Sequence, residues 1–133
     1  MKKFGDLTSN LEALVHTREQ DMENPFVVSG IFNQFPTQFE LGWKVLKKPS
    51  EYEGMGKGLG SPRGVIKVAY QHLDFMGGDV WLSMLKGRND TVRLYDDTAA
   101  RALTARVIAR YVPEFQRMRA AIEERYGAEL ENL

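Results

Sequence analysis

The stretch "FVVSGIFNQFPTQFELGWKVLK", residues 26–47, decides how this chain is expected to fold. Large apolar residues recur in it at three- and four-residue steps, which is the spacing of one face of an α-helix. Its first residues would also suit a β-strand, but no other segment offers a strand partner. We therefore predict a largely buried helix from Phe26 to Lys47. Pro36 lies inside it and is expected to kink or split it, because proline removes a backbone donor.

The rest of the chain also shows helical periodicity. Four further helices are predicted around apolar stripes: at Phe4–Val15, at Pro62–Phe75, from an Asp79 N-cap onward, and over 95–127 with a kink at Pro113. A glycine-rich loop is predicted after Pro49. Helices joined by short connections predict an all-α fold, an up-and-down bundle of four or five helices. A length of 133 residues suits a single domain, residues 1–133.

The composition narrows the chemistry. The chain has no cysteine, two histidines and a formal net charge of zero. Disulfides and zinc–cysteine sites are excluded, and neither a metal site nor a cofactor is expected. A neutral chain has no global basic character of the kind that favours nucleic acid. The first residues do not resemble a signal peptide, and no window is apolar for long enough to span a membrane, so a cytoplasmic location is expected.

A second stretch, "MLKGRNDTVRLYDD" at residues 84–97, carries the candidate site. Its hydrogen-bonding side chains are Arg88, Asn89, Arg93 and Tyr95. In a straight helix Arg88 and Tyr95 would fall on the same face as Trp81, where the apolar stripe should continue. An arginine there is costly if it is unpaired. Arg88 is therefore expected either to pair with a carboxylate or to line a cleft.

Two interpretations of this stretch remain open. In the first, it is only an ion-pair network, with Arg88 bound to an acid and Arg93 to Asp97. In the second, the four side chains bind a phosphate or nucleotide, because the planar guanidinium matches phosphate oxygens and tyrosine can stack or donate its hydroxyl. Arg88 is then also the candidate catalytic residue. Arg88 and Arg93 point about 140° apart on a straight helix, so they converge only if the helix breaks or a second copy completes the cleft.

The aromatic residues of the chain also have two interpretations. Phe39, Trp43 and Trp81 are expected to form core, but an apolar surface wider than one bundle can cover would become a partner or dimer face. Glu40 and Lys44 are four residues apart and are expected to pair across one helical turn.

Four motifs in order give the chain a resemblance to a known family. They are "FELGWK" (39–44), "SPRGVIKVAY" (61–70), "WLSMLKGRN" (81–89) and "YDD" (95–97). Together they resemble the bacterial nucleotidyltransferase substrate-binding proteins, a branch of the HEPN superfamily, over nearly the whole chain. The resemblance implies a helical-bundle homodimer that works with a separate minimal nucleotidyltransferase subunit.

The resemblance also implies roles for the second stretch. The related HEPN toxins share a site similar to that of a ribonuclease, made of an arginine, a histidine and a tyrosine. In toxin–antitoxin pairs, the partner nucleotidyltransferase adenylylates that tyrosine. Arg88 and Tyr95 match the first and last of these, but Arg93 stands where the histidine is expected. Arginine stays protonated and cannot accept a proton. A substrate-binding subunit, with Tyr95 as a modification candidate, is therefore favoured over a metal-independent ribonuclease toxin. A plain dimerisation module is the third alternative.

Overall fold

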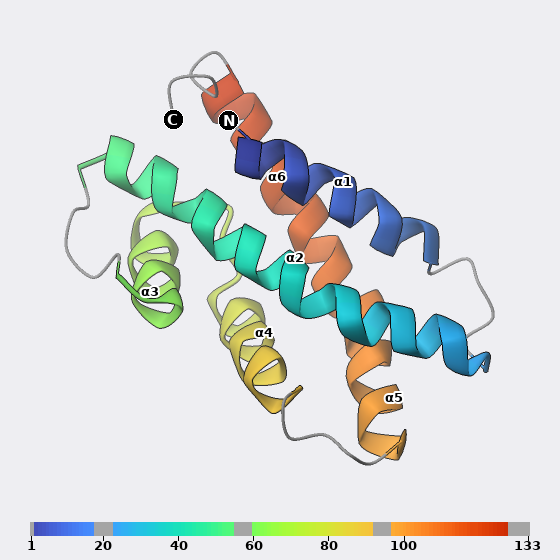
Figure 1. The fold of residues 1–133 in the computed structure, drawn as a ribbon. Helices are drawn as coiled ribbons and strands as arrows, with labels where there is room; N and C mark the ends of the chain where they lie inside the picture. Colours follow the sequence, from blue (N-terminus) through green and yellow to red (C-terminus); the bar gives the residue numbers. More distant parts are fainter. Residues whose placement is uncertain (1, 18–22, 55–59, 92–96, 128–133) are drawn as a thin grey trace.

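The computed structural model describes residues 2–17, 23–54, 60–91 and 97–127, and these residues form helices and no β-strand (Figure 1). The elements are α1 (Lys2–Thr17), α2 (Pro25–Tyr52), α3 (Pro62–His72), α4 (Gly78–Asp90), α5 (Asp97–Arg106), the π-helical turn η1 (Val107–Tyr111) and α6 (Val112–Tyr126). The last three elements follow one another without a break. The prediction of an all-α bundle of four or five helices is confirmed.

Helix α2 runs through the middle of the bundle (Figure 1). It packs against α1 on one side and against α3, α4 and α5 on the other, while α6 packs against α1. The core contains the five fully buried aromatic side chains of Phe35, Phe39, Trp81, Tyr111 and Phe115. Two of them come from α2, one from α4 and two from the last helical segment, so this core fixes α2 against the helix that carries Arg88.

The length of α2 differs from the prediction. Its start agrees, since the Asn24 side chain accepts a hydrogen bond from the Phe26 backbone N–H at 2.9 Å. It neither splits at Pro36 nor ends at Lys47, and it continues through Pro49 to Tyr52. Each proline removes one backbone donor, but the helix continues through both and buries Phe35, Phe39 and Leu46 beside them. The predicted loop after Pro49 therefore starts only after Tyr52.

Two other helix boundaries correct the sequence-based expectations. Helix α3 ends at His72 and not at Phe75, because Leu73 has an extended conformation. The N-cap of α4 is Gly77, and Asp79 lies within the first turn and does not cap it. An acidic side chain in a first turn is still favourable, because it faces the positive end of the helix dipole.

The predicted kink at Pro113 takes the form of a change in helix type. The chain switches to a π-helical turn over Val107–Tyr111 and returns to α-helix at Val112, one residue before the proline. Proline cannot donate to the carbonyl four residues earlier, and its ring crowds that carbonyl. A π turn shifts the hydrogen-bonding register and absorbs this conflict without ending the helix.

Gly42 explains how closely α2 approaches its neighbours. A β-carbon at this position would lie 2.9 Å from Cε1 of Phe115 and 3.0 Å from Cη2 of Trp81. Any larger residue would therefore push α2 away from α4 and α6. The glycine in "FELGWK" is thus a packing requirement of this bundle.

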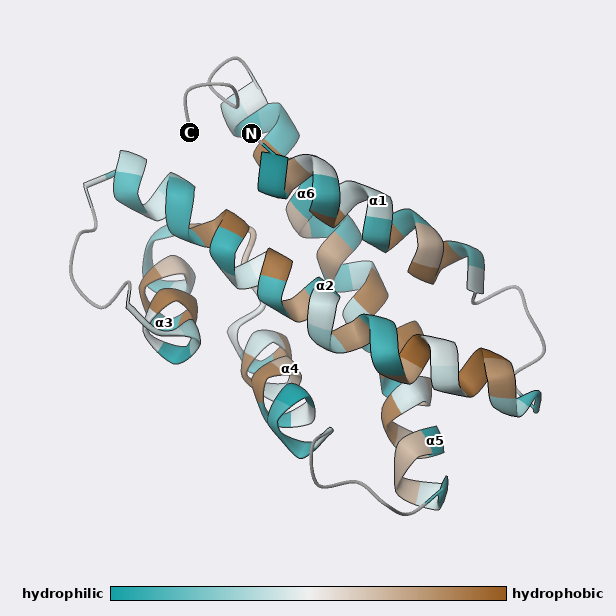
Figure 2. Ribbon diagram, viewed as in Figure 1, coloured by the Kyte–Doolittle hydropathy of each residue, from teal (hydrophilic) through white to brown (hydrophobic). Residues whose placement is uncertain are grey.

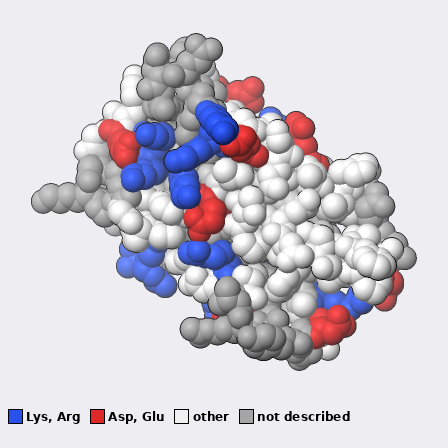
Figure 3. Space-filling view, in the orientation of Figure 1, with Lys and Arg blue, Asp and Glu red and all other residues white. Residues whose placement is uncertain are grey.

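The two halves of α2 present different surfaces. Residues 25–39 contain no charged side chain, whereas Glu40, Lys44, Lys47, Lys48 and Glu51 follow within three turns. Figure 2 shows hydrophobic residues towards the start of the helix, where Phe26 is 88% exposed. Figure 3 shows a broad uncharged surface over this half, with charged side chains gathered around the other half. Among the described residues, no helix is both long and apolar enough to cross a membrane.

Candidate functional site

Arg88 lies in the last turn of α4 and reaches across to α2. Its Nη1 donates a hydrogen bond to Oε1 of Glu40 at 2.7 Å. Its guanidinium carbon lies 5.4 Å from the centre of the Phe39 ring, within the range of a cation–π interaction. The side chain is 28% exposed. Arg88 is therefore paired with a carboxylate, as one of the two interpretations expected, and it remains accessible from solvent.

Glu40 is the centre of this polar cluster. While Oε1 accepts from Arg88, Oε2 accepts from the indole Nε1 of Trp43 at 3.1 Å and lies 3.8 Å from Nζ of Lys44. The predicted pairing of Glu40 with Lys44 is confirmed. The ion pair joins "FELGWK" on α2 to "WLSMLKGRN" on α4, two of the motifs that carry the family resemblance. We call Glu40, Trp43, Lys44 and Arg88 the surface cluster.

The guanidinium of Arg88 is only partly satisfied. Its Nε is buried and has no hydrogen-bond partner among the described residues. An unsatisfied buried donor costs about 1–3 kcal/mol. Arginine can donate two parallel N–H groups to one oxyanion. The single hydrogen bond from Nη1 to Glu40 is therefore fewer than the guanidinium can make. The surface cluster therefore holds a partly exposed cation that makes fewer hydrogen bonds than its guanidinium can donate.

The other predicted site residues are only partly within the described structure. Asn89 follows Arg88 on α4 and is exposed. Arg93 and Tyr95 lie outside the described residues, and so does any convergence of Arg93 with Arg88. Within the described residues, Asp97 pairs with Arg101 at 3.0 Å.

The three aromatic residues considered for a partner face lie at different depths. Phe39 and Trp81 are fully buried within the single chain, so their side chains are not available to a partner. Both are core residues, as the first of the two interpretations expected. Trp43 is partly buried, and it is the one of the three whose side chain reaches the surface.

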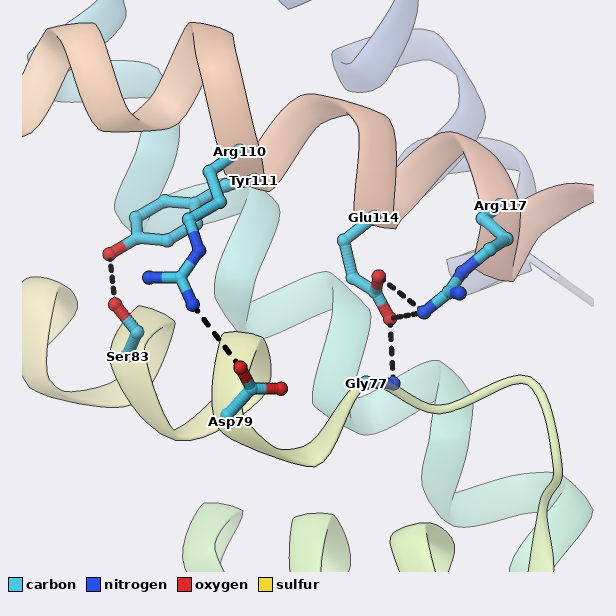
Figure 4. Close-up of polar contacts among 7 residues, drawn as sticks. All are labelled: Gly77, Asp79, Ser83, Arg110, Tyr111, Glu114 and Arg117. Carbon is cyan, nitrogen blue, oxygen red and sulfur yellow. Dashed lines mark hydrogen bonds and ion pairs between the residues drawn. The ribbon is translucent and has the colours of Figure 1, made fainter.

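A second carboxylate has a similar set of donors but is buried. Glu114 on α6 is 7% exposed and accepts a hydrogen bond from the backbone N–H of Gly77 at 3.0 Å (Figure 4). It also accepts from the indole Nε1 of Trp81 at 3.2 Å. Nη2 of Arg117 lies 2.8 Å from its Oε1 and 2.6 Å from its Oε2. We call these four residues the buried cluster. It holds the start of α4 against α6, and no motif in the sequence predicts it.

Two further side chains of α4 contact the π turn. The hydroxyls of Ser83 and Tyr111 are 2.6 Å apart, and Nη2 of Arg110 lies 3.3 Å from Oδ2 of Asp79 (Figure 4). Tyr111 is fully buried. Arg110 and Tyr111 both belong to the π turn. Together with Glu114, they hold α4 in the orientation that brings Arg88 to α2.

The histidines lie elsewhere. His16 borders a pocket of about 270 Å³ between α1 and α6, and His72 borders a pocket of about 170 Å³ with Glu53 and Arg125. Both side chains are exposed. Among the described residues, no group of three or more histidine or acidic side chains is arranged to hold a metal ion. The surface cluster contains neither histidine.

The comparison with protein families agrees with the motif order. A family described as "Nucleotidyltransferase substrate binding protein like" matches residues 1–124. The chain belongs to this family. The match spans α1 to α6 and includes both clusters, and the family description implies a nucleotidyltransferase as partner. No curated protein matches the chain.

Proposed function

We propose that this member of the nucleotidyltransferase substrate-binding family is a non-catalytic binding subunit. It binds the phosphate part of a nucleotide or nucleotide-like substrate through Arg88, Asn89, Arg93 and Tyr95, and it docks a separate nucleotidyltransferase that carries out the transfer. The observation that carries this proposal is the partly exposed Arg88, held through a single donor and with Nε unsatisfied. A phosphate accepts from a guanidinium in the bidentate manner that this arrangement leaves unused.

A direct binding measurement tests the proposal. ATP and inorganic pyrophosphate are titrated into the wild-type protein, Arg88→Ala and the control Arg125→Ala by calorimetry at low ionic strength. Arg125 is also a partly exposed arginine paired with one aspartate, Asp74. Loss of binding in Arg88→Ala, with binding retained in Arg125→Ala, supports the proposal. Equal binding by all three proteins contradicts it.

The quaternary arrangement belongs to the same proposal. Two copies pair so that the α4 ends lie at the seam, because only a second copy or a helix break would bring Arg88 and Arg93 together. The uncharged surface over residues 25–39 provides an area that a second copy can cover without burying charge. The mass of one chain is 15.2 kDa. Sedimentation of the purified protein is expected to give twice this mass. A monomer at micromolar concentration contradicts this part.

Modification of Tyr95 is a separate element of the proposal. If the partner nucleotidyltransferase adenylylates Tyr95, incubation with the partner and ATP adds one AMP per chain by mass spectrometry. Tyr95→Phe removes the mass shift, and Tyr52→Phe, which changes an exposed tyrosine on α2, leaves it unchanged. The absence of a shift with an active partner contradicts modification but leaves phosphate binding untouched.

Ribonuclease activity is the outcome that would replace this function. Metal-independent cleavage of RNA by the wild-type protein, lost in Arg88→Ala, would assign the chain to the toxin class.

A cytoplasmic location is proposed together with the binding function, because nucleotide substrates are found there.

A further inference from the structure

The surface cluster contains its own anion. Glu40 neutralises Arg88 from the opposite helix, at the position that a phosphate oxygen would have to take. Both partners are within reach of solvent, with 28% of the Arg88 side chain and 35% of the Glu40 side chain exposed. Ion pairs at this depth contribute little and exchange readily with other charges. A more highly charged anion can therefore displace Glu40 from Arg88 and take its place.

A phosphate offers Arg88 what Glu40 does not. Glu40 accepts one hydrogen bond from Arg88, through Nη1, and the buried Nε stays without a partner. A phosphate group carries more charge than one carboxylate and has oxygens spaced for the two-pronged donor set of arginine. Exchange of Glu40 for phosphate therefore increases the number of hydrogen bonds that the guanidinium makes once it turns towards the ligand.

Glu40 has other partners when it leaves Arg88. Lys44 is one helical turn away on α2, with Nζ 3.8 Å from Oε2, and the Trp43 indole already donates to that oxygen. These two residues keep an ion pair and a hydrogen bond at Oε2 on the same helix, while Oε1 of the partly exposed Glu40 turns to water. Arg88 is the one donor to Glu40 in this cluster that comes from a different helix, so it is also the contact that can be lost without rearranging α2.

We propose that Glu40 is an internal competitor for the phosphate of the substrate, so that Arg88 becomes available only to ligands that displace it. The proposal rests on the function proposed above. It makes Glu40 a specificity-determining residue, because weakly charged anions fail to displace the carboxylate and phosphate esters succeed. In the bound state, Glu40 pairs with Lys44 and Arg88 pairs with the ligand.

The test compares two variants that each lose one negative charge from α2. Inorganic pyrophosphate is titrated into the wild type, Glu40→Gln, Glu51→Gln and Arg88→Ala by calorimetry. Glu51 lies farther along α2, and it is also an acid paired with lysines, Lys47 and Lys48. Glu40→Gln is expected to bind about two- to fivefold more tightly than the wild type, the effect expected from breaking one partly exposed ion pair. Glu51→Gln is expected to match the wild type.

The outcomes separate the two proposals. Tighter binding in Glu40→Gln alone supports the internal competitor. Equal affinity in Glu40→Gln and the wild type, with binding lost in Arg88→Ala, overturns the competitor and leaves the binding function standing. An equal gain in Glu51→Gln overturns it as well, since the effect would then be general charge. No binding by the wild type or by Glu40→Gln overturns both proposals.

The tryptophan in the surface cluster gives a second readout. The indole of Trp43 is bonded to Glu40, while the other tryptophan, Trp81, is fully buried. Pyrophosphate is expected to change the emission of the wild type and not that of Trp43→Phe, in which the buried Trp81 is the remaining tryptophan. Unchanged wild-type emission at saturation overturns the displacement of Glu40.

Discussion

Glu40 and Glu114 each accept hydrogen bonds from an arginine and a tryptophan indole, yet they lie at very different depths. Glu114 is 7% exposed and also accepts the Gly77 backbone N–H, while Glu40 is 35% exposed and has Lys44 as its additional neighbour. The same types of donor therefore surround both carboxylates. The two carboxylates differ in how easily water can take the place of a lost partner when a contact breaks.

This difference in depth separates a structural contact from an exchangeable one. The donors to Glu114 include a buried indole and a backbone amide, which lose their partner completely if the carboxylate leaves. The donors to Glu40 are close to solvent, so water or a ligand can take its place. The buried cluster thus holds α4 to α6, and the surface cluster is suited to binding.

The largest effect is expected from Glu114→Ala. It leaves the Trp81 indole and the Gly77 amide without an acceptor, and the free energy of unfolding is expected to fall by about 2–4 kcal/mol. Urea denaturation followed by circular dichroism measures this. Glu123→Ala is the control, since Glu123 is an exposed acid on the same helix, 3.8 Å from Arg119. A loss below about 1 kcal/mol would mean that burial does not distinguish the two carboxylates.

Gly42→Ala tests the packing that brings both clusters together. The added β-carbon meets Phe115 and Trp81, and the crowding is expected to cost about 1–2 kcal/mol after the better helix propensity of alanine is counted. Gly30→Ala, in the same helix, has nothing within 4 Å of the new carbon and is expected to be neutral or stabilising. If both variants gain stability in urea, the close approach at Gly42 is not limiting.

Tyr111→Phe measures a neutral hydrogen bond at the same α4 surface. It removes the hydroxyl that contacts Ser83 at 2.6 Å, and a loss of about 1 kcal/mol is expected because Tyr111 is fully buried while Ser83 can turn to water. Thermal unfolding of this variant is compared with that of Tyr70→Phe, whose side chain is 59% exposed. A loss larger than that of Glu114→Ala would contradict the leading role of the buried carboxylate.

The smallest stability effect is expected from Glu40→Gln. The amide oxygen still accepts from Trp43 or Arg88, and the pair is partly exposed, so the free energy of unfolding should change by less than about 1 kcal/mol. Urea denaturation checks this beside the binding measurement. A destabilisation equal to that of Glu114→Ala would show that the surface cluster is structural and would weaken its proposed role in binding.

Sequence patterns located the helices well and their ends less well. The stripes that start at Phe4, Phe26 and Pro62 became α1, α2 and α3 because periodicity of three and four residues is a local property. The continuation of α2 through Pro36 and Pro49 was missed, because packing on both sides of the helix offsets the lost donors. Gly77, and not Asp79, is the N-cap of α4, because its carbonyl accepts from the Trp81 N–H. Its own N–H donates to Glu114, a contact that spacing along α4 does not reveal.

The sequence by itself determined the helical class, the order of the family motifs and the presence of an arginine on an apolar stripe. Only the tertiary structure decided that Arg88 pairs with Glu40, 48 residues earlier, and that Glu114 is buried against Trp81. Periodicity specifies which face of a helix turns inward. It does not specify which residues of two distant helices meet, because that depends on how the helices pack, and here Gly42 sets how closely α2 approaches α4.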